Sequence, residues 1–337
     1  MMINQITFTR FLAAISIVIF HFGHNTFFYE NDYINFIISH ANIGVSYFFI
    51  LSGFIMVIAY NNKSINAFDY YKNRFARIYP MYIFALLLFL TISDNNSKTL
   101  ILYHILGIQS WIPGFPLTLN MPGWSISVEI FFYSLFPLIF YFLKKYTFKT
   151  VSIAIITFWI ISQLFTHFFL MYFYEGYPSK SHDFVFYFPV IHLNEFLIGN
   201  LSALFFLTKI KVKNYDILII IFVLITIIIF KFTSLQLHNG LLAVTFAPLI
   251  ILISANNGYI TKIFNNKILH YLGEVSYSLY ILQYPVHVIM EKACIHYHIP
   301  TNNLQFFSIF VLVLLIFSAI SYELIEKNAR RLIKKFS

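Results

Sequence analysis

The chain has 337 residues, of which 59% are hydrophobic and only 10% are charged. A soluble domain carries roughly 25% charged residues, so the composition excludes an ordinary soluble protein and indicates a protein embedded in lipid. The formal net charge is +9, which would favour a nucleic acid partner in a soluble chain. The placement of the basic residues, described below, argues against nucleic acid. Cys294 is the single cysteine, which excludes a disulfide within the chain.

Ten apolar segments approach the length of about 20 residues that a membrane-spanning helix needs. In chain order they cover residues 5–24, 42–60, 78–93, 124–143, 150–173, 188–208, 215–232, 238–254, 273–293 and 304–325. The sequence therefore predicts an all-α polytopic membrane protein, a bundle of about ten transmembrane helices forming one domain over residues 1–337. The stretch 100–109 is too short to span and is expected to be re-entrant or interfacial. The first segment has no basic leader or cleavage pattern, so we expect it to be retained as a span.

Basic residues are distributed unequally between the two ends of these segments. Seventeen lie on one side and four on the other, with Arg10 inside the first segment. Because basic loops stay in the cytoplasm, we expect both termini to be cytoplasmic and the protein to lie in the inner (plasma) membrane. The seventeen are Lys63, Lys72, Arg74, Arg77, Lys144, Lys145, Lys149, Lys209, Lys211, Lys213, Lys262, Lys267, Lys327, Arg330, Arg331, Lys334 and Lys335. The net charge is thus explained by membrane topology, without a nucleic acid partner.

Two ionisable residues lie within the first predicted span, where such groups are costly and are candidates for function. Arg10 and His21 are 11 residues apart, which is three helical turns, so they share a helix face and lie about 16 Å apart along its axis. Arg10 is expected near the cytoplasmic surface and His21 toward the outer side. The alternatives are a snorkelling interfacial arginine and a histidine that is bonded to a neighbour.

Two further groups are candidates for a site. Arg74 and Arg77 share a helix face at the cytoplasmic entry to the third span, and paired guanidinium groups suit phosphate; alternatively, they anchor the helix at the membrane surface. Glu129 lies within the apolar fourth span and needs a partner. It could orient an imidazole, pair with an arginine or serve the structure alone. No metal site is expected, because the histidine spacings do not match a helical zinc motif.

Several short motifs follow one another in an order that is specific as a set. They are Arg10…His21, Gly44-Val-Ser-Tyr-Phe-Phe-Ile-Leu-Ser-Gly53-Phe, Arg74-x-x-Arg77-Ile-Tyr-Pro80, Trp124-Ser-Ile-Ser-Val-Glu129, Ser276-Tyr-Ser-Leu-Tyr-Ile-Leu-Gln283-Tyr-Pro285 and Glu323-Leu-Ile-Glu326-Lys. This set resembles the acyltransferase 3 family of membrane-bound O-acyltransferases, from about residue 3 to residue 331.

The resemblance implies a ten-helix membrane enzyme. Its members move an acyl group, usually acetyl from cytoplasmic acetyl-CoA, to a sugar hydroxyl of an extracytoplasmic glycan or glycolipid. By position, Arg10 and His21 match the family's essential first-span pair, and Arg74 and Arg77 match the arginines linked to acyl-CoA use. Glu129 matches the acidic residue of the family's Trp-Ser motif. No permanently bound cofactor is implied, because acetyl-CoA is a donor substrate.

The chain departs from many relatives at three positions. Ser46 stands where they have an acidic residue, Gln283 where they have histidine and Asn328 where they have proline. We therefore expect the chemistry at His21, as a general base or a transient acetyl acceptor. Either serine at positions 125 and 127, or a tyrosine, could donate to the carbonyl oxygen. The chain ends soon after its last predicted span, so no fused periplasmic esterase-like domain is expected.

A transporter or flippase of lipid-linked sugar is the alternative function. It would share the many spans, the intramembrane charge and the basic inner face. It would not transfer labelled acetyl from acetyl-CoA to a glycan in a manner that depends on His21. The sequence leaves open which glycan is acetylated (O-antigen, capsule, exopolysaccharide, peptidoglycan or lipid-linked oligosaccharide), which short acyl group is transferred, and the oligomeric state.

Overall fold

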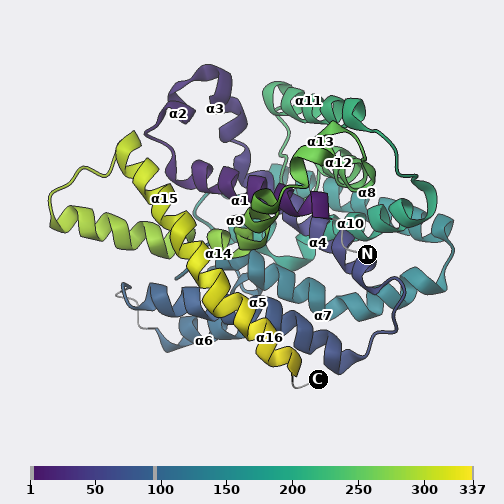
Figure 1. Cartoon of the computed structure of the whole chain (residues 1–337), viewed down its shortest axis with the longest axis horizontal. Helices are drawn as coiled ribbons and strands as arrows, with labels where there is room; N and C mark the ends of the chain where they lie inside the picture. The colour runs from purple at the N-terminus through teal and green to yellow at the C-terminus, as the bar shows by residue number, and fades with distance from the viewer. Residues whose placement is uncertain (1–3, 94–96, 336–337) are drawn as a thin grey trace.

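The computed structural model describes residues 4–93 and 97–335, and within these ranges every named element is helical. The side chains of Lys334 and Lys335 lie outside the described part. The α-helices are α1 (Thr7–Phe22), α2 (Phe27–Glu30), α3 (Asp32–Ile38), α4 (Gly44–Tyr60), α5 (Ala67–Leu90), α6 (Lys98–Leu106), α7 (Gly123–Lys145), α8 (Phe148–Tyr172), α9 (Lys180–Tyr187), α10 (Pro189–Lys209), α11 (Asp216–Phe232), α12 (Ala243–Ala255), α13 (Tyr259–Phe264), α14 (Lys267–His296), α15 (Leu304–Ser321) and α16 (Lys327–Lys335). Figure 1 shows their arrangement.

Each of the ten predicted apolar segments overlaps one of the longer helices of the structure. An apolar segment in lipid folds as a helix because a helix satisfies its backbone hydrogen-bonding groups internally. These helices are α1, α4, α5, α7, α8, α10, α11, α12, α14 and α15. Within the described residues, five helical stretches are long and apolar enough to cross a membrane, namely Asp32–Tyr60, Gly123–Lys145, Phe148–Tyr172, Lys180–Lys209 and Leu304–Ile333. The expected all-α polytopic membrane protein is confirmed, and the count of ten crossings stays a prediction.

Helix α5 begins at Ala67, well before the predicted third span. The side chain of Asn66 accepts a hydrogen bond from the backbone N of Asp69 at 3.3 Å and caps the helix. Pro80 lies inside the helix, although it cannot donate to the preceding turn. As a result, Arg74 and Arg77 lie within a continuous helix, one turn apart, and not in a loop that precedes it.

Helix α12 begins later than its predicted span. Residues 238–242 form a turn in which Asn239 and Gly240 have positive φ angles of 61° and 94°. Asparagine and glycine tolerate this left-handed conformation. The turn ends the preceding loop before the helix begins at Ala243, and it becomes part of the site described below.

Close backbone contacts hold the centre of the bundle together. Helices α4 and α10 pack along one another, and α1 packs along α14. At the α4–α10 crossing, a Cβ on Gly53 would lie 2.1 Å from the carbonyl oxygen of Phe196. A Cβ on Gly199 would lie 2.0 Å from that of Ile50. Small residues allow such approach between membrane helices, so both glycines are required for this pairing.

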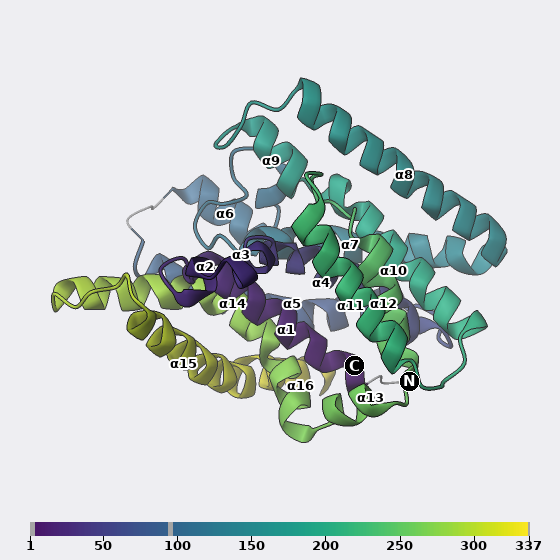
Figure 2. The ribbon, with the colours of Figure 1, turned by 90° about the horizontal axis from the view of Figure 1, so that it is seen from above.

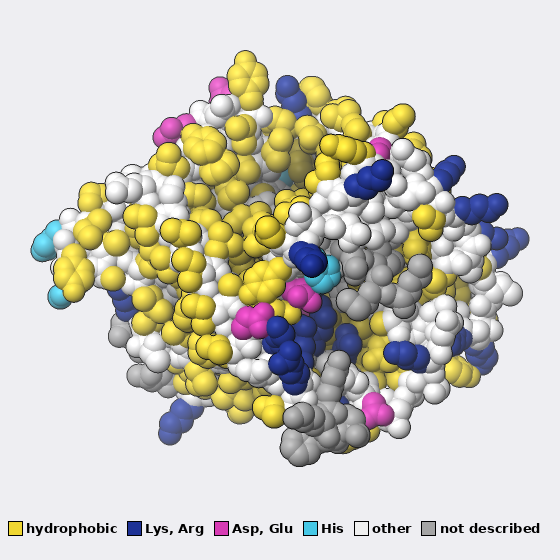
Figure 3. All heavy atoms as spheres, viewed as in Figure 1, with side chains coloured by type: hydrophobic (Ala, Val, Ile, Leu, Met, Phe, Trp, Pro, Cys, Tyr) yellow, Lys and Arg dark blue, Asp and Glu magenta, His cyan; other side chains and the backbone are white. Residues whose placement is uncertain are grey.

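The outer helices expose apolar side chains. Figure 2 shows α8 at the edge of the bundle, and Figure 3 shows a broad apolar surface over much of one face. Only 17% of the apolar window of α8 is buried, compared with 67% for the stretch that contains α4. An exposed apolar surface of this extent fits contact with lipid.

The segment before α7 packs against the start of that helix. Gln109 Nε2 donates to the carbonyl oxygen of Gly123 at 2.8 Å, and Ser110 Oγ donates to that of Trp124 at 2.9 Å. Both side chains are buried. These hydrogen bonds fix the first turn of α7, which carries the motif that leads to Glu129.

We predict that Gly199→Ala destabilises the protein although alanine is the better helix former. Helix propensity alone would stabilise the variant by about 1 kcal/mol, but the added Cβ overlaps the Ile50 carbonyl oxygen. The net loss should be at least about 1 kcal/mol, or roughly 2–4 °C in the thermal midpoint of the purified protein in detergent. Gly44→Ala, whose Cβ would meet its neighbours at 3.1 Å, should cost less. A higher midpoint for Gly199→Ala would contradict the close crossing.

Candidate active site

A cavity of about 360 Å³ lies among α1, α4, α5, α7, α14 and α16. We call it the arginine cavity. Its charged lining residues are Arg10, Arg74, Arg77, Arg330, Glu129 and Glu274. Four arginines against two glutamates leave an excess of positive charge, which suits an anionic ligand.

Glu129 is held by two hydroxyl groups inside the arginine cavity. Ser52 Oγ donates to Oε1 at 3.0 Å and Tyr133 Oη donates to the same oxygen at 2.7 Å. The guanidinium carbon of Arg74 lies 5.5 Å from the centre of the Tyr133 ring. The structure therefore places Glu129 among the arginines, and in the described chain its hydrogen bonds do not include the imidazole of His21.

The arginines differ in their partners. Within the described residues, Arg10, Arg74 and Arg77 have no carboxylate within 4.0 Å. Arg74 Nη1 instead approaches the Met56 sulfur at 3.2 Å, and its Nε is buried without a hydrogen bond. Arg330 is paired with Glu326, one turn before it. A buried guanidinium group without a carboxylate partner raises the free energy of the folded protein, and a bound anion offsets this cost. These arginines can therefore bind phosphate.

A second space of about 460 Å³ adjoins the arginine cavity. We call it the basic pocket. It shares Arg74, Arg77 and Arg330 with the arginine cavity and adds Lys63, between α4 and α5, and Asp69, in the first turn of α5. The arginine cavity therefore adjoins a space whose wall carries three arginines and Lys63. In Figure 3, dark blue side chains gather near α16.

A third space of about 800 Å³ lies beyond the arginine cavity. We call it the histidine cavity, because five histidines line it. They are His21 at the end of α1, His40 before α4, His182 in α9, His192 in α10 and His238 before α12. Part of its remaining wall is aromatic, with Trp124 and several tyrosines.

Val45 and Tyr280 line both the arginine cavity and the histidine cavity. The Tyr280 hydroxyl lies 2.9 Å from Ser125 Oγ, which lines the arginine cavity. Ser127 is fully buried, accepts a hydrogen bond from the Ser110 backbone N and lines none of the three spaces. The basic pocket, the arginine cavity and the histidine cavity thus form a row, with Val45 and Tyr280 at the boundary between the last two.

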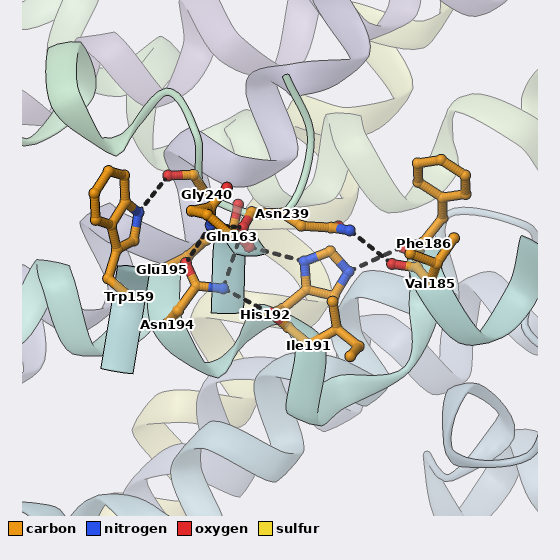
Figure 4. Close-up of polar contacts among 10 residues, drawn as sticks. All are labelled: Trp159, Gln163, Val185, Phe186, Ile191, His192, Asn194, Glu195, Asn239 and Gly240. Carbon is orange, nitrogen blue, oxygen red and sulfur yellow. Dashed lines mark hydrogen bonds and ion pairs between the residues drawn. The ribbon is translucent and has the colours of Figure 1, made fainter. Parts of the chain in front are cut away.

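A buried polar network supports the wall of the histidine cavity (Figure 4). His192 Nδ1 lies 2.8 Å from Glu195 Oε2, and its Nε2 lies 2.9 Å from the carbonyl oxygen of Phe186. Since a carbonyl oxygen only accepts, the Nε2 of His192 donates to it. Both ring nitrogens are therefore engaged, which fixes the ring between α9 and α10.

The same network holds the turn before α12. The carbonyl oxygen of Asn239 accepts from Gln163 Nε2 at 2.7 Å and from Asn194 Nδ2 at 3.1 Å, and Asn239 Nδ2 donates to the Val185 carbonyl at 2.7 Å. Trp159 Nε1 donates to the Gly240 carbonyl at 2.8 Å. The turn is therefore bonded to α8, α9 and α10, and it carries His238 into the cavity wall.

The sequence-predicted residues are divided between two of these spaces. Arg10, Arg74, Arg77 and Glu129 line the arginine cavity, whereas His21 lines the histidine cavity. Arg10 and His21 lie near opposite ends of the single helix α1. Among the described residues, no group of three or more histidine, cysteine, aspartate or glutamate side chains is arranged to hold a metal ion.

Comparison with known protein families identifies the family of the chain. Residues 3–322 match the acyltransferase domain family. The chain belongs to this acyltransferase family. The resemblance found in the sequence motifs is thereby confirmed.

The sequence identity between the chain and individual curated relatives is low. The chain is 25% identical to the O-acetyltransferase OatA of Staphylococcus aureus (strain NCTC 8325 / PS 47), over 96% of this chain and 56% of OatA. It is 30% identical to the acyltransferase MdmB of Streptomyces mycarofaciens, over 42% of this chain and 40% of MdmB. The chain thus spans less than two thirds of the curated relatives it matches. No solved structure matches the chain.

Sequence reasoning missed three lining residues of this acyltransferase-family chain. From the sequence, Arg330 is included only as a topological charge, and His192 and His238 are not among the candidate site residues. The signals were spacings at which helical side chains meet: Glu326 lies four residues before Arg330, and Glu195 three residues after His192. His238 gave no comparable signal, because its position depends on the turn at Asn239.

We predict that Gly240→Ala destabilises the wall of the histidine cavity. The residue has a φ of 94°, and the added Cβ would lie 2.1 Å from Asn194 Oδ1. Strain and overlap together should cost about 2–4 kcal/mol, measured as a lower thermal midpoint in detergent. Gly176→Ala is the matched control, because its φ is 86° and its Cβ would meet nothing within 4 Å. Equal losses for the two variants would show that the network around Asn194 contributes nothing beyond backbone strain.

Proposed function

We propose that the protein is an O-acetyltransferase of the inner membrane that crosses the bilayer ten times with both termini in the cytoplasm. It moves acetyl from cytoplasmic acetyl-CoA to a hydroxyl of an extracytoplasmic glycan or lipid-linked sugar, of the O-antigen, capsule or exopolysaccharide type. The observation that carries this proposal is the row of spaces in which guanidinium groups line one cavity and His21 lines the next. Family membership and the O-acetyltransferase name of OatA support it.

The donor enters from the basic pocket. Arg74, Arg77 and Arg330 bind the phosphates of acetyl-CoA, because each lines both the basic pocket and the arginine cavity. The pantetheine arm extends through the arginine cavity past Arg10. Its thioester then reaches the boundary formed by Val45 and Tyr280, beyond which His21 lies. The 11 residues from Arg10 to His21 correspond to about 16 Å along α1, a length that the extended arm covers.

The acceptor enters the histidine cavity from the outer side. His21 takes the proton of a sugar hydroxyl, and the oxygen attacks the thioester carbonyl. The carbon–sulfur bond breaks, the sugar ester forms, and the imidazolium returns the proton to the CoA thiolate. The Tyr280 hydroxyl, at the boundary of the two cavities, donates to the carbonyl oxygen while that oxygen carries negative charge.

Arg10 and Glu129 act through charge in this scheme. Arg10 lies in the arginine cavity on the same helix as His21, and its positive charge favours the negative charge that develops at the carbonyl oxygen. Glu129 balances part of the positive charge of the arginine cavity. The hydrogen bond from Ser52 joins α4 to α7 beside the donor, and the hydrogen bond from Tyr133, within α7, holds the Glu129 carboxylate in place.

We predict that His21→Ala lowers kcat for acetyl transfer about 10²–10⁴-fold, the range for loss of a general acid–base group. The assay is transfer of labelled acetyl from acetyl-CoA to glycan in membranes or with purified protein. His24→Ala is the control, since His24 packs on Tyr29 with ring centres 4.4 Å apart and lines none of the three spaces. A folded His21→Ala variant that acetylates at the normal rate would refute the assignment. Labelled acetyl that never reaches glycan, even with the unaltered protein, would favour the transporter.

We predict that Arg330→Ala raises KM for acetyl-CoA about 10- to 100-fold with a smaller effect on kcat, because a charge-assisted hydrogen bond contributes about 1.5–3 kcal/mol. Arg74→Ala and Arg77→Ala should behave alike. Arg331→Ala is the matched control, since this neighbouring arginine is exposed and lines none of the spaces. If Arg330→Ala lowers the thermal midpoint but leaves KM unchanged, Arg330 serves only its pair with Glu326.

A further inference from the structure

None of the described residues that line the histidine cavity is an aspartate, glutamate, lysine or arginine. This contrasts with the arginine cavity next to it, which has six. A ligand that enters the histidine cavity therefore meets imidazole rings, amides, hydroxyls and aromatic faces. At neutral pH and above, an unperturbed histidine is uncharged.

The one carboxyl group directly behind this wall is paired with a histidine. Glu195 is fully buried behind His192 and lies 2.8 Å from its ring nitrogen (Figure 4). Because Nε2 of His192 donates to the Phe186 carbonyl, an ionised Glu195 requires a second proton on His192, and the pair has no net charge in either state. An anionic group placed in the cavity would therefore lose its water without gaining an uncompensated cation.

One buried acceptor in the wall has no partner. Gln283 is fully buried and lines the histidine cavity; its Nε2 donates to the Tyr280 carbonyl at 2.8 Å, while its Oε1 has no hydrogen bond in the described structure. A buried acceptor without a donor costs about 1–3 kcal/mol. A sugar hydroxyl can donate to this oxygen, whereas an ionised carboxylate or phosphate has acceptors only.

The aromatic part of the wall adds a surface for the apolar face of a sugar ring. Trp124 and Tyr187, with ring centres 4.9 Å apart, both line the cavity, and so does Tyr177, which is exposed. The cavity volume of about 800 Å³ lies within the range of about 300–1,000 Å³ for ligand sites. Aromatic faces with a few placed polar groups are the chemistry that binds an uncharged polyhydroxyl ring.

We infer that the histidine cavity takes an uncharged sugar, with no carboxylate or phosphate on the ring that is acetylated, and that one of its hydroxyls donates to Gln283 Oε1. The inference rests on the proposed function and narrows its acceptor class. The cavity would discriminate against a charged sugar because the charged group would lose its hydration without gaining a partner of opposite charge.

The test compares matched acceptors at pH 8, where unperturbed histidine is uncharged. Purified protein with labelled acetyl-CoA is given p-nitrophenyl hexosides, the corresponding hexuronides and the corresponding 6-deoxyhexosides. The 6-deoxyhexosides lack the primary hydroxyl without gaining charge, so they separate loss of that hydroxyl from gain of a carboxylate. We expect kcat/KM for the better uncharged acceptor to exceed that for the hexuronide about 10- to 100-fold. Equal or faster transfer to the hexuronide overturns the inference while leaving the proposed function intact.

A charge variant tests the wall directly. Gln236 lies in the loop before α12, is only partly buried and lines the cavity. Gln236→Arg should raise the hexuronide-to-hexoside ratio of kcat/KM at least about 10-fold, whereas Gln236→Met, of similar size, should leave the ratio as it is. An unchanged ratio in a folded Gln236→Arg variant that still transfers acetyl counts against the cavity as the acceptor site.

If none of these sugars accepts acetyl, mass spectrometry of glycan from cells with and without the gene decides. Acetyl on an uncharged hexose supports the inference, and acetyl on a uronic acid or a phosphorylated ring overturns it. Glycan that carries no acetyl dependent on the gene overturns the proposed function, and the inference with it.

Discussion

The structure depends on how it keeps positive charge inside an apolar bundle. Lipid cannot solvate a guanidinium group, so intramembrane arginines must face a carboxylate, a backbone carbonyl, a water-filled cavity or a ligand. Here five helices turn charged residues toward one cavity, where Glu129 and Glu274 balance only part of the charge. The remaining positive charge of the cavity favours the binding of an anion. The apolar surface of α8 follows from the same constraint, since its one charged residue, Lys149, lies in the first turn and the rest of the helix is uncharged.

The packed helices α4 and α10 carry residues of both the arginine cavity and the histidine cavity. Gly53 follows Ser52, which donates to Glu129 in the arginine cavity, whereas Gly199 lies two turns after His192, which lines the histidine cavity. The close crossing at the two glycines fixes the positions of these residues relative to each other. A rigid central pair of this kind gives a site that is organised before its substrates bind, which lowers the cost of binding them.

The positions of the helices could be predicted from the sequence, but which of their side chains line the same cavity could be predicted only in part. Hydropathy located these helices because each must satisfy its backbone groups alone. It placed the start of α5 too late, since residues 67–77 contain four charged residues and fall outside the apolar segment. Motif spacing identified Arg74, Arg77 and Glu129 as candidates. It could not show that Arg330 faces the same cavity, or that a turn at Asn239 brings His238 to the wall, because both depend on contacts between helices that are distant in the chain.

Helix α14 runs beside both cavities without interruption. Glu274 lines the arginine cavity and Tyr284 the histidine cavity, with Tyr280 between them at the boundary. The ten residues from Glu274 to Tyr284 span about 15 Å at 1.5 Å per residue. Tyr280, at the boundary, lies six residues or about 9 Å beyond Glu274 along the same helix. In the proposed reaction the acyl carrier bridges the distance from the arginines to Tyr280, so this one helix spaces the charged part of the site from the place where the acyl group is transferred.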